Sequence, residues 1–422
     1  MDLSPERRLL LACARSKLTP EGYRRIANLA GAQLDWDQLV SVSYAHGIAP
    51  LIYYSLQQSD VTDRIPPTAA KALRDSYYLN AARNTLLYNG LRKILMALNN
   101  ESIEVIVLKG AALAETVYRH RTLRPMLDID LLVRKEKVAK VETQLLAMGY
   151  RLDERERAKE YYQQHHYHFP FTKGSAMSTE IHWHIKLPTD PFKIDIDGLW
   201  ERAQRINIAG VEAFLFSQED LALYLCQHFW KHGLEGGIRP ICDIAEATTY
   251  YRDKIDWQKV ASISAQWELN SCSYLGLWLA KELLDAPIPE EFLRDLRPVN
   301  FNMEVVNWAR ERVLAYGERA LVFPDLLELL WKGCSVKQRW AILQRILSRK
   351  TVAAYGNDAS ASKKAYIYYP LRIKSLFTRY GPAAYGLLAG NKKIRTAVAA
   401  AADREVKQQR LSQWLSEAAF NK

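Results

Sequence analysis

The sequence has 422 residues and a formal net charge of +11, with 49% hydrophobic and 25% charged residues. This length predicts two or three domains, and the composition is that of a globular protein, which excludes a disordered or fibrous chain. The sequence contains no run of about 18 apolar residues, so no membrane-spanning helix is expected, and its start lacks the apolar core of a signal peptide. The five cysteines are scattered without metal-binding spacing, which predicts reduced, mostly buried thiols and a cytoplasmic protein.

The positive charge is concentrated at the C-terminal end. From residue 351 onward, 12 Lys and Arg stand against 4 Asp and Glu, a net charge of +8, which leaves about +3 for the rest of the chain. Such a basic tail can bind nucleic acid, an anionic membrane surface or another anionic partner, or it can serve only solubility or local structure. Residues 354–364 are small and polar and form the expected linker to this tail.

Hydrophobic periodicity predicts an α+β fold, in which a small mixed β-sheet core is flanked by N-terminal and C-terminal helical regions. The expected parts are an N-terminal helical region (1–100), a core of strands and helices (101–216), a helical domain (217–350), and a linker with a basic C-terminal tail (351–422). A long amphipathic helix is expected over residues 67–99. Ser217 begins a further helix as its N-cap, with Asp220 three residues later.

Within the expected core, strand and helix patterns alternate along the chain. The predicted elements are a strand at 105–110, a helix at 111–120, a strand at 127–133 and a helix at 135–148. A hairpin follows, with strands at 165–171 and around Glu180 joined by a turn at 172–175. Because proline cannot donate a ladder hydrogen bond, Pro170 is expected to place the first hairpin strand towards a sheet edge.

Two carboxylates lie one residue apart on the strand at 127–133. Alternate side chains share a face of a strand, so Asp128 and Asp130 point one way and the residues between and after them point into the core. Like charges held this close repel unless a cation lies between them, and carboxylate oxygens suit Mg²⁺. Glu180, on a later strand, is the candidate third ligand. The alternative is a solvated strand edge without metal.

A glycine, then an Asp-x-Asp pair, then an acidic residue on a later strand resembles the DNA polymerase beta-like nucleotidyltransferase superfamily. Residues 109–110, 124–130 and 145–150 resemble one branch more closely, the uncharacterised bacterial nucleotidyltransferases often encoded beside polysaccharide or peptide-modification genes. This closer resemblance covers about residues 100–185, and a looser one extends from the N-terminus to about residue 250.

Two features depart from the pattern of that superfamily. Ala111 follows Gly110, where members usually have serine or a second glycine, so contacts to phosphate must come from backbone N–H groups or from Lys109. The gap of 18 residues between Gly110 and Asp128 is longer than in compact members and leaves room for a helix. The N-terminus of such a helix can bind an anion.

The resemblance implies metal-dependent transfer of a nucleoside monophosphate from an NTP to a hydroxyl or phosphate group of a small molecule, sugar, peptide or protein. Asp128 and Asp130 would hold Mg²⁺ or Mn²⁺, in total two ions, and Glu180 would complete the acceptor-side ion or take the hydroxyl proton. The residues expected to bind the nucleotide are Gly110, where the backbone approaches phosphate, Lys109 and Arg124, which offer positive charge, and His182 in the wall of the site.

Other side chains admit competing interpretations. Five histidines (165, 166, 168, 182 and 184) could suggest zinc, but zinc needs three or four converging ligands, which spacing alone does not guarantee. His228, Arg239 and Asp243 either line the cleft or include a buried Arg–Asp pair that fixes the helical domain.

Two other functions are alternatives to nucleotidyl transfer onto a small molecule, sugar, peptide or protein. The first is a partner protein of a biosynthetic pathway that keeps the fold but has weak or lost activity. The retention of three acidic residues argues against it, since an inactive site has no physical need for clustered charge. The second is transfer onto RNA, which rests only on the basic tail, because the chain has no recognised RNA-binding signature.

Overall fold

The computed structural model describes residues 3–152, 166–174, 177–231, 234, 236–299 and 301–316, with Lys407, Arg410, Leu411 and Trp414. Met1–Gly317 and Gln413–Lys422 form one unit, and Glu318–Ser412 form a second. The helices and strands below belong to the first unit. The predicted linker at 354–364 and nearly all of the basic tail lie outside the described residues. Among the described helices, none has the length and apolar character needed to cross a membrane.

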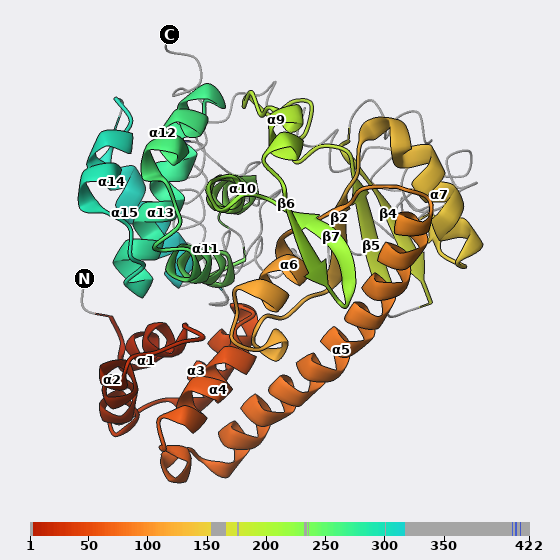
Figure 1. The fold of residues 1–422 in the computed structure, drawn as a ribbon. Helices are drawn as coiled ribbons and strands as arrows, with labels where there is room; N and C mark the ends of the chain where they lie inside the picture. The colour runs from red at the N-terminus through yellow and green to blue at the C-terminus, as the bar shows by residue number, and fades with distance from the viewer. Residues whose placement is uncertain are drawn as a thin grey trace, which may run out of the picture. The chain divides into compact units, whose positions relative to one another are not determined.

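The N-terminal part is helical, as predicted. Its elements are α1 (Pro5–Cys13), α2 (Pro20–Ala30), α3 (Trp36–Ala45), α4 (Ala49–Gln58), the 3₁₀ helix η1 (Thr62–Arg64) and α5 (Pro67–Asn100). Ser4, Thr19 and Asp35 cap the first three helices by accepting backbone N–H hydrogen bonds. The long helix α5 runs from the N-terminal helices to the sheet (Figure 1), where it contacts three strands. It therefore links these helices to the sheet.

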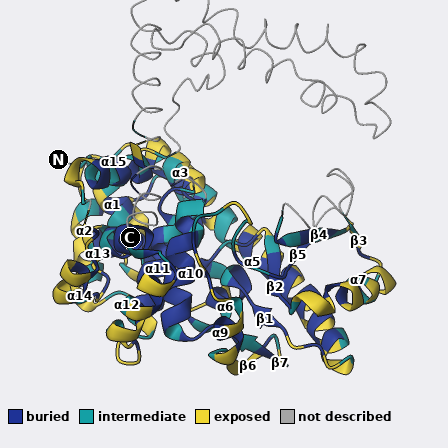
Figure 2. Cartoon of the chain, turned by 90° about the horizontal axis from the view of Figure 1, so that it is seen from above, coloured by how far each residue is buried: buried dark blue, intermediate teal, exposed yellow. Residues whose placement is uncertain are grey.

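Seven strands form one mixed sheet in the order β3-β4-β5-β2-β1-β7-β6. They are β1 (Ile106–Val107), β2 (Asp128–Leu132), β3 (Arg151–Leu152), β4 (His168–Lys173), β5 (Met177–His182), β6 (Gln204–Ile208) and β7 (Val211–Leu215). β2 pairs parallel to β5 and antiparallel to β1, which pairs parallel to β7. Apolar side chains of α5, of the sheet and of α7 (Val138–Ala147) form its core, and Figure 2 shows the central strands as largely buried. The mixed sheet and flanking helices confirm the predicted α+β class.

Three details of the predicted core are wrong. The strand expected at 105–110 has only two residues, because the helix-favouring run that starts at Lys109 forms α6 (Lys109–Thr116) two residues earlier than expected. β4 lies between β3 and β5 and is no edge strand, although the described part of β3 pairs only with Phe171 and Thr172, just past Pro170. The β6–β7 hairpin was not anticipated.

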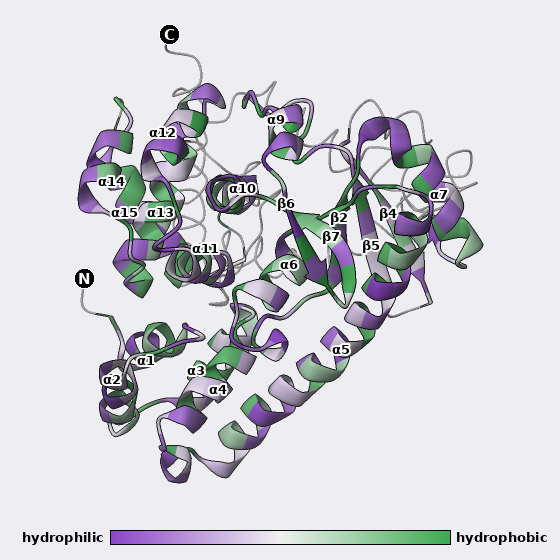
Figure 3. Ribbon diagram, viewed as in Figure 1, coloured by the Kyte–Doolittle hydropathy of each residue, from purple (hydrophilic) through white to green (hydrophobic). Residues whose placement is uncertain are grey.

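The remaining described elements are mostly helical. They are η2 (Arg121–Leu123), η3 (Lys135–Lys137), α9 (Ile196–Glu201), α10 (Gln218–Lys231), α11 (Arg239–Tyr250), α12 (Trp257–Gln266), α13 (Asn270–Leu284), α14 (Glu290–Leu296) and α15 (Met303–Leu314). Ser217 Oγ accepts the Asp220 N–H at 3.2 Å, as the N-cap prediction requires. α10 is buried along most of its length, and Figure 3 shows that α11 to α15 mix apolar and polar faces. Four cysteines are free and buried, as predicted, and Cys334 lies outside the described residues.

Candidate functional site

Three carboxylates converge on one face of the sheet. The parallel register of β2 and β5 places Asp130 beside Glu180, and Asp128 lies on the same face two residues earlier. One oxygen of each carboxylate lies within 4.8 Å of the others, while Ile129 and Leu131 are fully buried on the opposite face. Because β2 is a central strand and Asp130 is only 1% exposed, a solvated strand edge does not describe this site.

A lysine and a histidine contact the most buried carboxylate. Lys109 Nζ lies 3.2 Å from Asp130 Oδ2, and His182 Nε2 lies 3.1 Å from Asp130 Oδ1 and 3.3 Å from Glu180 Oε2. The backbone fixes the lysine, because the N–H of Leu108 donates to the Asp130 carbonyl at 3.0 Å just before α6 begins. The structure thus brings Lys109 and His182, two of the predicted nucleotide-binding residues, to the carboxylates.

The charges of this cluster shift its pKa values in opposite directions. Burial raises the pKa of Asp128 to about 6, and the negative charge of Asp130 adds to the effect. Burial would also raise the pKa of Asp130, but Lys109 and His182 outweigh it and hold that pKa well below its usual range. Burial disfavours the charged forms of Lys109 and His182, yet the carboxylates raise both pKa values. A divalent cation would relieve the repulsion at Asp128, and three carboxylates form the oxygen donor set that Mg²⁺ and Mn²⁺ prefer.

Arg124 lies in a buried ion pair with Asp243 of α11. Its Nε and Nη2 donate to the two oxygens of Asp243 at 2.9 and 2.7 Å, and the Tyr118 hydroxyl donates to the same carboxylate at 2.9 Å. The buried Arg–Asp pair expected in the helical domain therefore exists, but its arginine is Arg124 and not Arg239. Of the three guanidinium nitrogens of Arg124, Nε and Nη2 donate to Asp243 and Nη1 does not.

Gly110 allows the segment before β2 to pack closely on α6. A Cβ atom at this position would lie 3.2 Å from Arg124 Nη1 and 3.5 Å from the Met126 side chain. Gly110 is an ordinary helical residue and has no positive φ. The structure therefore accounts for this glycine by the approach of Arg124, within reach of the site carboxylates.

Part of the site wall lies on α10, where His228 was a predicted cleft residue and Tyr224 and Lys231 were not anticipated. Tyr224, His228 and Lys231 are four and three residues apart, which places them along one face of a helix. The charge of His228 helps to lower the pKa of Asp130. Lys231 Nζ lies 3.9 Å from the centre of the Tyr167 ring, and that ring lies 5.4 Å from the His182 ring. Burial and the charge of Lys109 lower the pKa of Lys231 to about 8. The spacing of these three polar residues was the signal available in the sequence.

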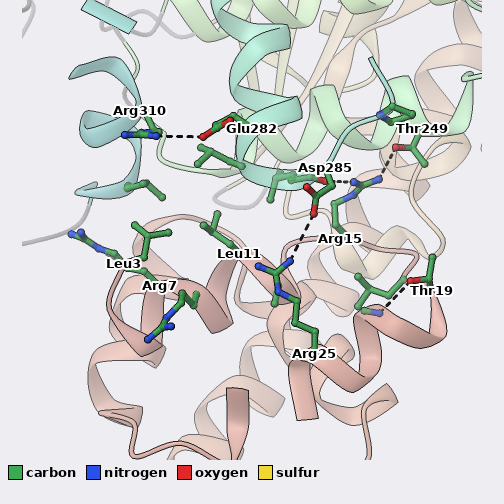
Figure 4. A pocket seen from close by; sticks show the side chains of 18 of the residues that line it. Leu3, Arg7, Leu11, Arg15, Thr19, Arg25, Thr249, Glu282, Asp285 and Arg310 are labelled. Carbon is green, nitrogen blue, oxygen red and sulfur yellow. Dashed lines mark hydrogen bonds and ion pairs between the residues drawn. The ribbon is translucent and has the colours of Figure 1, made fainter. Parts of the chain in front are cut away.

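One cavity adjoins this wall and another lies apart from it. A cavity of about 410 Å³ is lined by Tyr167, Trp183, His184 and Trp200, among others. A cavity of about 750 Å³ lies between α1–α2 and α13–α15 (Figure 4). Three of its arginines have acidic partners: Arg15 with Glu246, Arg25 with Asp285 and Arg310 with Glu282. None of the residues that line this second cavity belongs to the carboxylate cluster.

The family match identifies the chain as a nucleotidyltransferase. The chain belongs to the family described as uncharacterised nucleotidyltransferases, whose model matches residues 32–285. The solved structure of the antibiotic-resistance factor ANT(2'')-Ia is similar at 17% identity, covering 44% of this chain and 91% of that one, with a TM-score of 0.31. No curated protein is significantly similar to the chain.

Proposed function

We propose that this protein transfers a nucleoside monophosphate from an NTP to a hydroxyl or phosphate acceptor in a divalent-metal-dependent reaction. The observation that carries the proposal is the convergence of Asp128, Asp130 and Glu180 within 4.8 Å on the buried face of β2 and β5. Family membership supports NTP as the donor. A sugar, peptide or other product of a polysaccharide or peptide-modification pathway is the proposed acceptor class.

The chemistry assigns a separate task to each side chain. Bound Mg²⁺ or Mn²⁺ would neutralise charge on the phosphates and on the attacking oxygen. Asp128 and Asp130 would hold two such ions between them, with Glu180 on the acceptor side. The acceptor oxygen attacks the α-phosphorus, the bond to the bridging oxygen breaks, and pyrophosphate leaves. Glu180 would take the hydroxyl proton.

The residues around the carboxylates would orient the triphosphate. Lys109 and Lys231 place two ammonium groups near the cluster, and Nη1 of Arg124 points towards Gly110. His182 would keep Asp130 and Glu180 in place through its contacts to both. Positioned cations of this kind stabilise charge without reorganising during the reaction.

The test is an NTP screen with matched variants. Wild-type protein would be incubated with each of the four α-labelled NTPs, Mg²⁺ or Mn²⁺, and fractions of lysate as acceptors. Label should pass to an acceptor with one preferred NTP, and Asp128→Asn and Asp130→Asn should each lower the rate by orders of magnitude. Equal labelling by the Asp128→Asn/Asp130→Asn double variant would overturn the proposal. NTP binding without transfer in any fraction would favour a partner protein with weak or lost catalysis.

A further inference from the structure

Three donor atoms from β4 and β5 converge beside the carboxylate cluster. The antiparallel register places His168 directly opposite His182, and Glu180 lies two residues before His182 on the same face. His168 Nε2 lies 3.8 Å and His182 Nε2 3.3 Å from the same oxygen, Glu180 Oε2. All three donor atoms lie within 4.8 Å of one another. The edges of two imidazoles therefore face one carboxylate oxygen.

The separations match those between ligands of one ion, and the hydrogen bond that His182 Nε2 makes to Asp130 Oδ1 at 3.1 Å is the contact that a bound ion would replace. A charge-assisted N–H···O bond is about 2.7–2.9 Å long, so 3.8 Å between His168 and Glu180 is too long for one. Ligands about 2.0–2.1 Å from a tetrahedral Zn²⁺ ion lie about 3.3–3.4 Å from one another. The distance from His182 to Glu180 already has that value, and a small rotation of His168 would bring its nitrogen to it.

The other histidines of this region do not share the arrangement. His184 Nδ1 accepts backbone N–H bonds from Ile185 at 2.9 Å and Lys186 at 3.2 Å, which turns it towards its own backbone. The His166 ring lies 6.3 Å from that of His168, edge to face. The rings of His168 and His182, in contrast, are 4.9 Å apart and inclined by only 32°. This near-parallel packing follows from their cross-strand pairing.

Donor chemistry decides which cation this site would select. Mg²⁺ takes oxygen ligands, whereas imidazole nitrogen suits Zn²⁺, Co²⁺ and Cu²⁺. We propose that His168, Glu180 and His182 form a second cation site that selects a divalent transition metal, while Asp128 and Asp130 hold Mg²⁺. The inference rests on the proposed function because Glu180 serves both sites. This second cation site would make the acceptor side of the reaction centre dependent on a transition metal.

Co²⁺ is the probe, because its visible absorption reports the ligands of the bound ion. Metal-free full-length protein would be titrated with Co²⁺ and, separately, with Mg²⁺, using absorption and calorimetry. His168→Gln should weaken Co²⁺ binding at least tenfold and leave Mg²⁺ binding unchanged. His120→Gln is the matched control, since His120 is exposed and packs its ring on Tyr54. Equal Co²⁺ affinity in wild type and His168→Gln would overturn the histidine site.

A second variant separates this inference from the proposed function. Asp128→Asn/Asp130→Asn should lose Mg²⁺ binding and keep the Co²⁺ absorption band. Loss of Co²⁺ binding in that variant, together with its retention in His168→Gln, would show that carboxylates alone hold the ions. If His168→Gln fails to fold, pulsed electron paramagnetic resonance of Cu²⁺ bound to the wild type in excess Mg²⁺ replaces it. Coupling of Cu²⁺ to imidazole nitrogen supports the site, and absence of that coupling overturns it.

Discussion

Lys109 Nζ contacts Asp130 Oδ2 at 3.2 Å, so the most buried carboxylate of the cluster is paired with the first residue of α6. The same ammonium group is the nearest candidate for the triphosphate of an NTP. Metal binding at Asp130 would weaken its hold on the lysine and leave Lys109 available for phosphate.

Lys109→Met should destabilise the metal-free protein. It leaves the buried charge of Asp130 with His182 as its remaining close partner, and breaking a buried pair typically costs about 3 kcal/mol or more. Saturating Mg²⁺ should recover part of that loss, since a cation then compensates Asp130. Denaturant unfolding with EDTA and with Mg²⁺ measures both effects. Lys93→Met, on the exposed face of α5, is the control and should change neither.

Asp128→Asn and Asp130→Asn should change metal-free stability in opposite directions. The pKa of Asp128 is raised to about 6, so its charge is disfavoured in the folded state and its removal should stabilise the protein at pH 7. The pKa of Asp130 lies far below its usual range because Lys109 and His182 favour its charge, so its removal should destabilise. Thermal unfolding in EDTA compares the two variants. Shifts of the same sign would contradict this account of the charges.

The pH dependence of stability follows from Asp128. Its pKa is about 6 in the folded protein and near 3.9 in an unfolded chain, so the folded state binds more protons between these values. Metal-free stability should therefore fall as pH rises from about 4 to 6, and Asp128→Asn should lack this part of the decline. Mg²⁺ competes with the same proton, so its affinity should weaken below about pH 6. Calorimetric titration with Mg²⁺ at pH 5 and pH 7.5 measures this change in affinity.

Lys231→Met should weaken NTP binding by about tenfold, the effect expected when one charge-assisted hydrogen bond is lost. Because the pKa of Lys231 is lowered to about 8, wild-type affinity should also decline as pH rises through 8, and the variant should not show this decline. Lys254→Met, on an exposed turn, is the control. Unchanged NTP affinity in Lys231→Met would show that Lys231 serves only its contact with Tyr167.

Gly110→Val should lower both stability and NTP affinity. A Cβ there already approaches Arg124 Nη1 to 3.2 Å, and the added methyl groups would push the guanidinium from Asp243. Overpacking of this kind costs about 1–3 kcal/mol. Gly110→Ala should be milder, because a small movement of Arg124 accommodates one carbon. Ala139→Val, on the exposed face of α7, controls for valine in a helix. If Gly110→Val were as stable as the wild type, the Arg124 side chain would be able to move aside without loss of stability.

Local patterns in the sequence predicted much of the fold. Alternation placed Asp128 and Asp130 on one face, and apolar periodicity predicted α5 and α7 close to their observed bounds. The sequence patterns could not predict contacts between distant segments, because strand register and helix docking depend on tertiary packing. The pairing of Arg124 with Asp243, 119 residues later, and the approach of Lys231 to Tyr167 are examples. The strand predicted at 105–110 contains β1 but is too long, because α6 already begins at Lys109.

Helix α11 holds two buried acidic residues one turn apart, and each binds an arginine from a different part of the chain. Asp243 binds Arg124, and Glu246 binds Arg15 with Nε to Oε1 at 2.9 Å. Residues 101–216 expressed alone would therefore carry Arg124 without its counterion, in the segment that leads into the strand with Asp128 and Asp130. The segment shared with the family, residues 32–285, retains Asp243 but leaves Glu246 without Arg15. A minimal active fragment should thus begin before Arg15 and extend through α11.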